Sequence, residues 1–157
     1  MAPTHHPSGQ ALANFLVGDC SPGASLLIAR HVKLCASCSS RVHAMGSVGV
    51  ESAPVACGER EILAPGLEIA VVTGVSGLGE AVYCVRAAPG VGLPQKEPSS
   101  AVEVLVLEGG LEADGVSYRA GDYLSLEETP KARLISAATT GCVYLKVTHA
   151  ASGQATD

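Results

Sequence analysis

The sequence His31-Val32-Lys33-Leu34-Cys35-Ala36-Ser37-Cys38 spaces one imidazole and two thiols as His-x3-Cys-x2-Cys. Residues four apart on a helix point the same way, so His31 and Cys35 can face one ion. Cys38 follows three residues later, near the next turn and within reach of the same point. These three groups would leave one position of a tetrahedral zinc site to be filled, and structural sites fill it with His or Cys. The pattern therefore predicts a metal site at the end of a helix.

The fourth ligand is expected from the N-terminal arm, where His5 and His6 precede the first helix. A Cys2His2 site would tie this arm to the helices, and structural zinc can contribute on the order of 10 kcal/mol to the folding of a small unit. The first fifty residues hold one side-chain carboxylate, that of Asp19, which argues against a catalytic zinc with its own general base. We therefore interpret the site as structural.

Two other interpretations of the cysteines stay open. Cys35 and Cys38 could form a redox pair like that of thioredoxin, but such a pair follows a strand and begins a helix, whereas this one follows a helix. Cys35 could also be an ordinary buried residue, because free cysteine packs as a small hydrophobic side chain. For the same reason we interpret Cys84 and Cys142, which fall on predicted strands, as core residues.

The residues around this motif have helical periodicity. Leu12, Phe15 and Leu16 share one stripe of a first predicted helix. Ser21 and Pro22 are typical of an N-cap and a first helical position, so a second helix is predicted to begin there. The three predicted helices cover residues 8–17, 21–35 and 39–47.

From residue 67 on, the hydrophobic period changes to that of short strands rich in valine. Asp114-Gly115 lies between two such segments, 110–111 and 116–118, which is a strong signal for a hairpin. Strands are predicted for 67–72, 80–86, 102–107, 123–126 and 142–147. Short strands at regular spacing with turns between them favour a β-sandwich or a small barrel.

We predict an α+β chain of two domains. Residues 1–48 would form a small zinc-braced helical domain, and residues 67–150 a β-sandwich or barrel. Residues 49–66 carry glycine and proline and few strong helix formers, so they are interpreted as a linker. A length of 157 residues leaves room for one domain or two small ones.

Charge and composition argue against several classes of function. The formal net charge of −5 argues against binding to a nucleic-acid backbone, because that needs clustered Lys and Arg. The apolar runs are shorter than the roughly 18 residues of a membrane span, and the N-terminal residues lack the basic charge of a secretory signal. We expect a cytoplasmic protein, in which a reducing environment disfavours structural disulfides.

Several short segments in the first half resemble a known family: His5-His6-Pro7, Leu16-Val17-Gly18, Ser25-Leu26-Leu27-Ile28-Ala29-Arg30-His31 and Leu34-Cys35-Ala36-Ser37-Cys38. They are similar to the zinc-binding anti-sigma domain of ChrR-type regulators. The resemblance implies that His6, His31, Cys35 and Cys38 bind one zinc ion. It also implies that the helical domain binds an extracytoplasmic-function (group IV) sigma factor and keeps it from RNA polymerase.

The second half resembles the cupin-like domain of that family, through Ala88-Pro89-Gly90, Leu93-Pro94, Val104-Leu105-Val106-Leu107-Glu108-Gly109, Tyr118, Gly121-Asp122 and Gly141-Cys142. Members with a metal in this domain carry Pro-x-His-x-His, a glutamate four residues later and a histidine beyond the Gly-Asp turn. The first three of these positions hold Lys96, Pro98 and Val102 here, and no histidine occurs between Gly121 and Cys142. Because proline and valine offer no ligand and protonated lysine is only a donor, we expect a cupin-like β-sandwich or barrel without a metal.

The leading hypothesis is a regulator that is not an enzyme and that covers sigma-factor surfaces needed by polymerase. Leu12, Phe15 and Leu16 are candidates for the partner-binding surface, or they form the small core of the helical domain. Two other hypotheses are kept, a cupin-type metalloenzyme and a zinc-thiolate redox sensor without a sigma partner. Copurification of a sigma factor would separate the first hypothesis from the other two.

Overall fold

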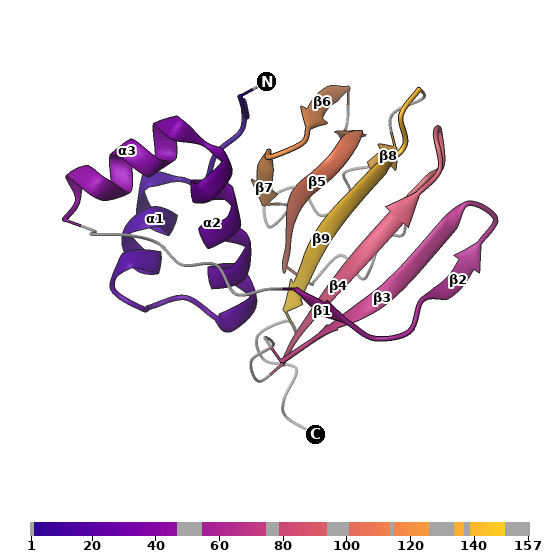
Figure 1. The fold of residues 1–157 in the computed structure, drawn as a ribbon, viewed down its shortest axis with the longest axis horizontal. Helices are drawn as coiled ribbons and strands as arrows, with labels where there is room; N and C mark the ends of the chain where they lie inside the picture. Colours follow the sequence, from indigo (N-terminus) through magenta and orange to yellow (C-terminus); the bar gives the residue numbers. More distant parts are fainter. Residues whose placement is uncertain are drawn as a thin grey trace.

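The computed structural model describes residues 2–46, 55–74, 79–93, 101–113, 115–125, 134–136 and 139–149. Within these residues three helices precede nine strands, and the helices lie together at one side of the sheet (Figure 1). The helices are α1 (Gly9–Leu16), α2 (Pro22–Leu34) and α3 (Ala36–Ala44). The strands are β1 (Ala56–Cys57), β2 (Glu61–Ala64), β3 (Leu67–Thr73), β4 (Glu80–Ala87), β5 (Ala101–Ala113), β6 (Val116–Arg119), β7 (Tyr123–Ser125), β8 (Leu134–Ser136) and β9 (Cys142–His149).

The helix starts follow from their capping residues. Ser8 precedes α1 and Ser21 precedes α2, and each serine side chain accepts a hydrogen bond from a backbone N–H of the first turn. Pro22 is the first residue of α2, as predicted. The third helix begins at Ala36 and not at residue 39, because the sulfur of Cys35 caps it by accepting the N–H of Cys38 at 3.5 Å. Cys38 therefore lies in the first turn of a helix, where its side chain has a fixed direction.

All strand pairs are antiparallel, in the order β1-β3-β4-β9-β5-β6, with β2 also beside β3 and with β7 and β8 beside β5. The strands predicted at 67–72, 80–86 and 142–147 are β3, β4 and β9. The strand predicted at 102–107 is the first half of β5, whose pairing with β9 shifts register between Val106 and Glu108. Beyond this shift β5 pairs with β6 and β8 instead of β7, so one strand joins two parts of the sheet.

The hairpin is confirmed on its two strands, since Ala113 of β5 pairs with Val116 of β6. Gly115 has a φ of 83°, the left-handed conformation that such turns require, while Asp114 lies outside the described residues. The strand predicted at 123–126 is β7, and its last predicted residue, Leu126, also lies outside them.

Two strands occur in the segment that the sequence indicates as a linker. Residues 47–54 lie outside the described part of the chain, but β1 and β2 both pair with β3. All residues of these two strands are exposed, so they lack the alternation of buried and exposed residues that identifies a strand. The third unpredicted strand, β8, is only three residues long.

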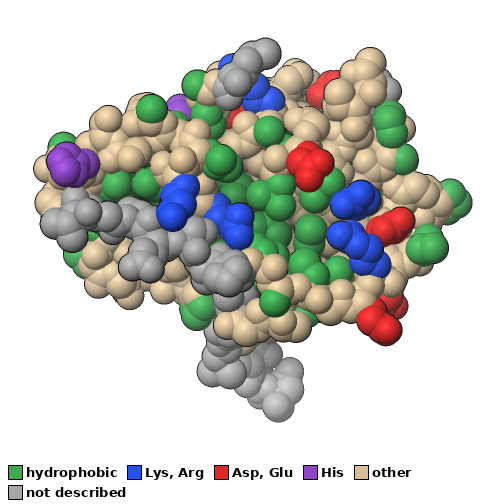
Figure 2. Space-filling model, in the orientation of Figure 1, with side chains coloured by type: hydrophobic (Ala, Val, Ile, Leu, Met, Phe, Trp, Pro, Cys, Tyr) green, Lys and Arg blue, Asp and Glu red, His purple; other side chains and the backbone are tan. Residues whose placement is uncertain are grey.

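Among the described residues, the buried hydrophobic side chains form two clusters, one on each face of the sheet. The first joins the helices to the sheet and contains Leu12, Leu26, Leu27, Ile28, Val32, Cys35, Cys38, Val42, Val72, Val82, Cys84, Leu105, Tyr123, Leu145 and Val147. The second lies on the other face and contains Val85, Val102, Val104, Val106, Leu111, Leu124 and Tyr144 among others. Figure 2 shows hydrophobic side chains gathered where the helices meet the strands, with charged side chains over the strands beside them. The helices thus bury their apolar stripes against the sheet and not only against one another.

Candidate metal centre

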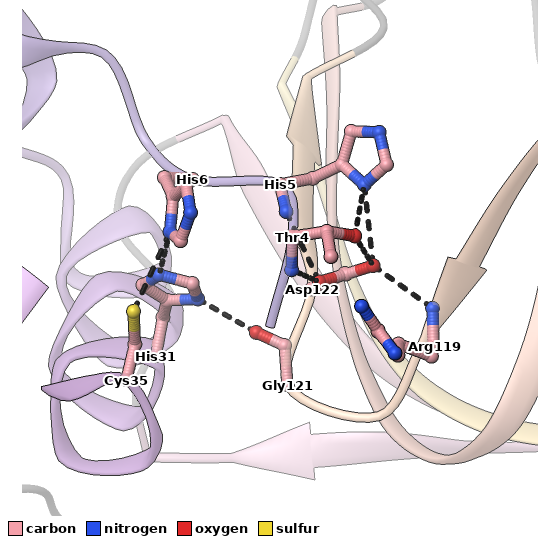
Figure 3. A network of polar contacts seen from close by, with 8 residues as sticks. All are labelled: Thr4, His5, His6, His31, Cys35, Arg119, Gly121 and Asp122. Carbon is pink, nitrogen blue, oxygen red and sulfur yellow. Dashed lines mark hydrogen bonds and ion pairs between the residues drawn. The ribbon is translucent and has the colours of Figure 1, made fainter. Parts of the chain in front are cut away.

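Four side chains from separate parts of the helical region converge on one point. His6 comes from the N-terminal arm, His31 from the last turn of α2, Cys35 from the α2–α3 junction and Cys38 from the first turn of α3. Their ligand atoms all lie within 4.8 Å of one another. Nδ1 of His6 is 3.3 Å from Nε2 of His31, 3.4 Å from Sγ of Cys35 and 3.5 Å from Sγ of Cys38. Figure 3 shows the side chains of His6, His31 and Cys35 directed at one another.

These distances fit a zinc ion. With Zn–N bonds of about 2.0–2.1 Å and Zn–S bonds of about 2.3 Å, the corners of a regular tetrahedron are about 3.3 Å (N–N) and about 3.5 Å (N–S) apart. The separations of Nδ1 of His6 from Nε2 of His31 (3.3 Å) and from the two sulfur atoms (3.4 and 3.5 Å) agree with these N–N and N–S values. Two thiols and two imidazoles are also a donor set that zinc prefers, and four protein ligands leave no coordination position for a substrate. The cluster therefore has the composition and shape of a closed, structural metal site.

The ring of His31 is held in the orientation that such a site needs. Its Nδ1–H donates a hydrogen bond of 2.6 Å to the carbonyl oxygen of Gly121, in the turn between β6 and β7. A carbonyl only accepts, so the proton is on Nδ1 and Nε2 is free to bind a cation. Burial lowers the pKa of His31, against an opposing effect of this hydrogen bond, and thereby favours the neutral imidazole that binds metals.

The thiol of Cys38 needs a nearby cation in order to ionise at neutral pH. Burial raises the pKa of Cys38 to about 11, and the neighbouring Cys35 acts in the same direction. Both side chains are almost fully buried, with 2% exposure for Cys35 and none for Cys38. Two adjacent buried thiolates are costly without a positive charge between them, which is what a zinc ion supplies.

The arm that carries His6 is fastened to the sheet by Asp122. The Asp122 carboxylate accepts hydrogen bonds from the backbone N–H of Thr4 (2.6 Å), His5 (3.1 Å) and Arg119 (2.9 Å), and from the ring of His5 (3.2 Å). The N–H of Tyr123 donates in return to the carbonyl oxygen of His5 at 3.1 Å. Figure 3 shows the result: His5 turns toward Asp122, while the next residue, His6, turns toward His31 and the sulfur of Cys35.

Asp122 remains ionised although its side chain is inaccessible to solvent. Burial raises its pKa, but the hydrogen bonds from Arg119, Thr4 and His5 outweigh burial and leave the pKa below its usual range. The sequence indicated Gly121-Asp122 only as a turn. The spacing of residues could not reveal that this turn contacts the metal cluster, because the hydrogen bond joins His31 and Gly121, which are 90 residues apart.

The three apolar residues expected at a partner surface are placed differently. Leu12 has no exposed surface and lies in the first buried cluster, since α1 packs its stripe against the other helices and the sheet. It cannot contact a partner in this conformation, so for Leu12 the core alternative holds. Phe15 and Leu16 are partly buried against the same cluster. In the described helical region the exposed large hydrophobic residues are Val17, Leu34 and Met45.

The β region offers fewer tests of the predicted sites. Val102, at a position where metal-binding cupin-like domains carry glutamate, is buried in the second cluster, while Lys96 and Pro98 lie outside the described residues. Cys84 and Cys142 are buried, as expected of core residues. None of the described helices is long and apolar enough to cross a membrane.

The family follows from comparison with known proteins. Residues 58–152 match the family described as the ChrR cupin-like domain, over more than half of the chain. The chain belongs to this family. No curated protein is detectably similar to it in sequence. The resemblance seen in Ala88-Pro89-Gly90 and the later segments of the sequence is thereby confirmed for the cupin-like half.

Solved structures extend the ChrR comparison to the helices. The crystal structure of Rhodobacter sphaeroides SigE in complex with the anti-sigma ChrR matches with a TM-score of 0.76 and 21% identity, over 92% of this chain and 98% of that one. KdgF from a Halomonas species matches less of the chain, with a TM-score of 0.46, 15% identity and coverage of 60% of this chain and 89% of that one. Three N-terminal helices followed by an antiparallel cupin-like sheet are therefore the ChrR fold.

Proposed function

We propose that this protein is an anti-sigma factor. Its helical region, residues 1–48, would bind a group IV extracytoplasmic-function sigma factor in the cytoplasm and keep it from RNA polymerase, without contacting nucleic acid. The observation that carries the proposal is the closed cluster of His6, His31, Cys35 and Cys38 in a chain of the ChrR cupin-like family. The similarity in fold to an anti-sigma protein crystallised with its sigma factor supports it.

Zinc held by these four residues would act as a cross-link between the arm, α2 and α3. The chain's own residues prepare the site: Gly121 orients the ring of His31, and Asp122 holds the arm that carries His6. The helices present exposed apolar side chains beyond the buried cluster, Val17 at 78% exposure and Leu34 at 55%. We propose that these residues, with the exposed edges of Phe15 and Leu16, cover the sigma factor.

The cupin-like sheet would regulate this interaction without a metal of its own. The turn between β6 and β7 contacts a metal-cluster residue through Gly121 and the N-terminal arm through Asp122. A ligand or modification that shifts the sheet can influence sigma binding only if it favours one of two conformations of this junction. We propose a binding protein and not an enzyme, because the metal cluster has four protein ligands and no open position, and because Val102 stands where metal-binding cupin-like domains carry a glutamate ligand.

Co-expression with the cognate sigma factor tests the proposal. We expect an equimolar complex that carries about one zinc per chain. Cys35→Ser and Cys38→Ser should lose both the zinc and the complex, because a Cys2His2 site with one ligand removed holds zinc far more weakly. Cys142→Ser is the matched control, since Cys142 is equally buried but belongs to the second cluster. A folded chain that binds the sigma factor without zinc would contradict the proposal.

The partner surface can be examined in the same complex. Val17→Asp should weaken sigma binding by roughly tenfold or more while zinc content stays unchanged. Ile62→Asp is the control, because Ile62 on β2 has almost the same exposure, 77% against 78%. Two tightly bound metals per chain, with no sigma factor retained, would instead favour the cupin metalloenzyme. Loss of zinc on oxidation in a chain that binds no sigma factor would favour the redox sensor.

A further inference from the structure

The four residues of the metal cluster differ in their access to solvent. His31 and Cys38 have no exposed surface and Cys35 has 2%, whereas His6 is exposed. A small molecule that approaches the cluster from solvent therefore meets His6 first. The cluster is thus accessible from the side of its N-terminal arm.

The ring of His6 is also held by fewer contacts than the ring of His31. Nδ1–H of His31 donates to the carbonyl oxygen of Gly121, outside the cluster. In the part of the chain that the structure describes, the His6 ring makes its hydrogen bonds through Nδ1 alone, and only to the other cluster residues. A second hydrogen bond fixes the ring of a metal-binding histidine, so a ring without one is less firmly oriented. We therefore expect His6 to leave the cluster more readily than His31.

A cavity of about 380 Å³ lies beside His6. The N-terminal arm, α1, β5 and β7 form its walls, and His6 is the one residue of the metal cluster that lines it. Ala11 belongs to the α1 wall and Glu103 to the β5 wall. Sites for small molecules in proteins have volumes of roughly 300–1,000 Å³, so this cavity is large enough for one.

The backbone on both sides of His6 is held, so its side chain can move alone. The carbonyl oxygen of His5 accepts the N–H of Tyr123 at 3.1 Å, and Ser8 caps α1. Rotation about the side-chain bonds of His6 would take its ring out of the cluster while the arm and the helix stay folded. The position that the ring leaves is next to the cavity, because His6 lines it.

The carboxylate of Glu103 determines which molecules the cavity can accept. It accepts hydrogen bonds from the hydroxyl of Tyr123 and from Nε2 of His149, the latter at 2.9 Å. Burial raises the pKa of Glu103, but these hydrogen bonds outweigh burial and leave the pKa below its usual range. Because an ionised carboxylate repels anions, the cavity is better suited to uncharged molecules than to anionic ones.

We propose that this cavity is a binding site for a small uncharged nitrogen base of the imidazole class, which takes the place of His6 in the metal cluster. The bond from Nδ1 of His6 to the ion breaks and a bond from the incoming nitrogen forms, with no change of charge or oxidation state. Such an exchange releases the arm, which the cluster otherwise joins to α2 and α3. The inference rests on the zinc proposed for this cluster and not on sigma binding.

His6→Gly tests the proposal, because it removes the ring and enlarges the cavity toward the cluster. The full-length variant should bind zinc roughly 100-fold more weakly or worse, since loss of a second-shell contact alone costs about 10–100-fold. Millimolar imidazole should restore most of this affinity, measured by competition with a chromogenic chelator. With cobalt(II) in place of zinc, imidazole should return the visible absorption spectrum to that of the unaltered chain, which would show that imidazole binds the ion directly.

His31→Gly is the matched control, because His31 is the same kind of ligand but is fully buried and does not line the cavity. Imidazole should not restore its zinc affinity. The double variants His6→Gly/Ala11→Leu and His6→Gly/Ala13→Leu test the cavity itself. Both alanines are partly buried on α1, but only Ala11 lines the cavity, so only the first double variant should resist rescue by imidazole.

The inference is overturned if imidazole fails to restore zinc binding to His6→Gly, or restores it equally to His31→Gly. Rescue that Ala11→Leu does not impair would equally overturn it, and equal rescue by the anion imidazole-4-acetate would overturn the assigned ligand class. An unaltered chain that holds no zinc would contradict the metal centre itself. Because sigma binding is not a readout, failure of this inference is distinguishable from failure of the proposed anti-sigma function.

Discussion

Asp122 shows how one residue connects the two halves of the chain. It is inaccessible to solvent, yet it accepts hydrogen bonds from the backbone of Thr4 and His5, next to the metal-cluster residue His6. A buried carboxylate with several donors is stabilising in its ionised form, and it is costly to leave those donors without an acceptor.

Asp122→Asn is expected to lower the free energy of unfolding at pH 7 by about 1–3 kcal/mol. The pKa of Asp122 in the folded chain lies below its ordinary value. Ionised Asp122 therefore contributes stability above pH about 4, and this contribution is lost as the pH falls through the folded-state pKa. Urea titrations at several pH values measure the difference in unfolding free energy between the unaltered chain and Asp122→Asn. This difference should stay constant from pH 7 to about pH 5 and become smaller at more acidic pH.

Asp19→Asn is the control for this measurement, because Asp19 is an exposed carboxylate. It should change stability by no more than about 0.5 kcal/mol at any of these pH values. A difference for Asp122→Asn that persists unchanged in acid would show that the side chain acts through its shape and not through its charge.

At the scale of elements, the turn between β6 and β7 is the part of the sheet that reaches the metal cluster. Gly121 has a φ of 92°, and a Cβ atom there would lie 2.7 Å from Cγ of Pro3 on the N-terminal arm. Its carbonyl oxygen accepts the hydrogen bond from His31. Glycine is thus required both by the backbone conformation and by the close approach of the arm.

Gly121→Ala should destabilise the protein by roughly 1–2 kcal/mol and also weaken zinc binding, because the added methyl group displaces the arm that carries His6. Equilibrium unfolding and competition with a chromogenic zinc chelator measure the two effects.

Gly115→Ala separates backbone strain from the contact with the arm. Gly115 has a similar φ of 83°, but a Cβ atom there meets nothing within 4 Å. This variant should lose stability to a comparable extent and keep its zinc affinity. If both variants weaken zinc binding equally, the contact with Pro3 does not position the arm.

At the scale of the molecule, the helices and the sheet depend on each other. They share one buried cluster, and α2 is fastened at both ends: Gly23 near its start donates its N–H to Glu80 of β4 at 2.9 Å, and His31 near its end donates to Gly121. An interaction that holds the helices together therefore also keeps them in place over one face of the sheet.

Removal of zinc by a chelator should loosen the sheet as well as the helices. Structural zinc can supply on the order of 10 kcal/mol, and without it the helices lose the cross-link that holds them on the shared cluster. Amides of α2 should exchange with solvent roughly tenfold faster or more, and those of Leu145 and Val147 on β9 should follow. Faster exchange in the helices alone, measured by mass spectrometry, would show that the sheet is stable without its helical cover.

Local patterns were sufficient to predict much of the helical region. Ser21 and Pro22 predicted the start of the second helix, and an apolar stripe predicted the first. The spacing of His31, Cys35 and Cys38 indicated a shared ion, because all of these signals depend on neighbours within one or two turns. The strands with buried valines were also recognisable from their alternation. The edge strands β1 and β2 were not, since both of their faces are exposed and their pairing with β3 leaves no period in the sequence.

The spacing of residues along the chain thus specified the starts of the first two helices, the inner strands and a cluster of candidate ligands, because these depend on local geometry. Contacts between distant residues specified the rest. They bury Leu12 of α1 in the cluster between the helices and the sheet, and they direct His6 rather than His5 at the thiols. They also bring Asp122 to the N-terminal arm and Gly121 to His31. The physical reason is that burial and long-range hydrogen bonds are properties of the packed chain, and a one-dimensional pattern carries no record of which surfaces meet.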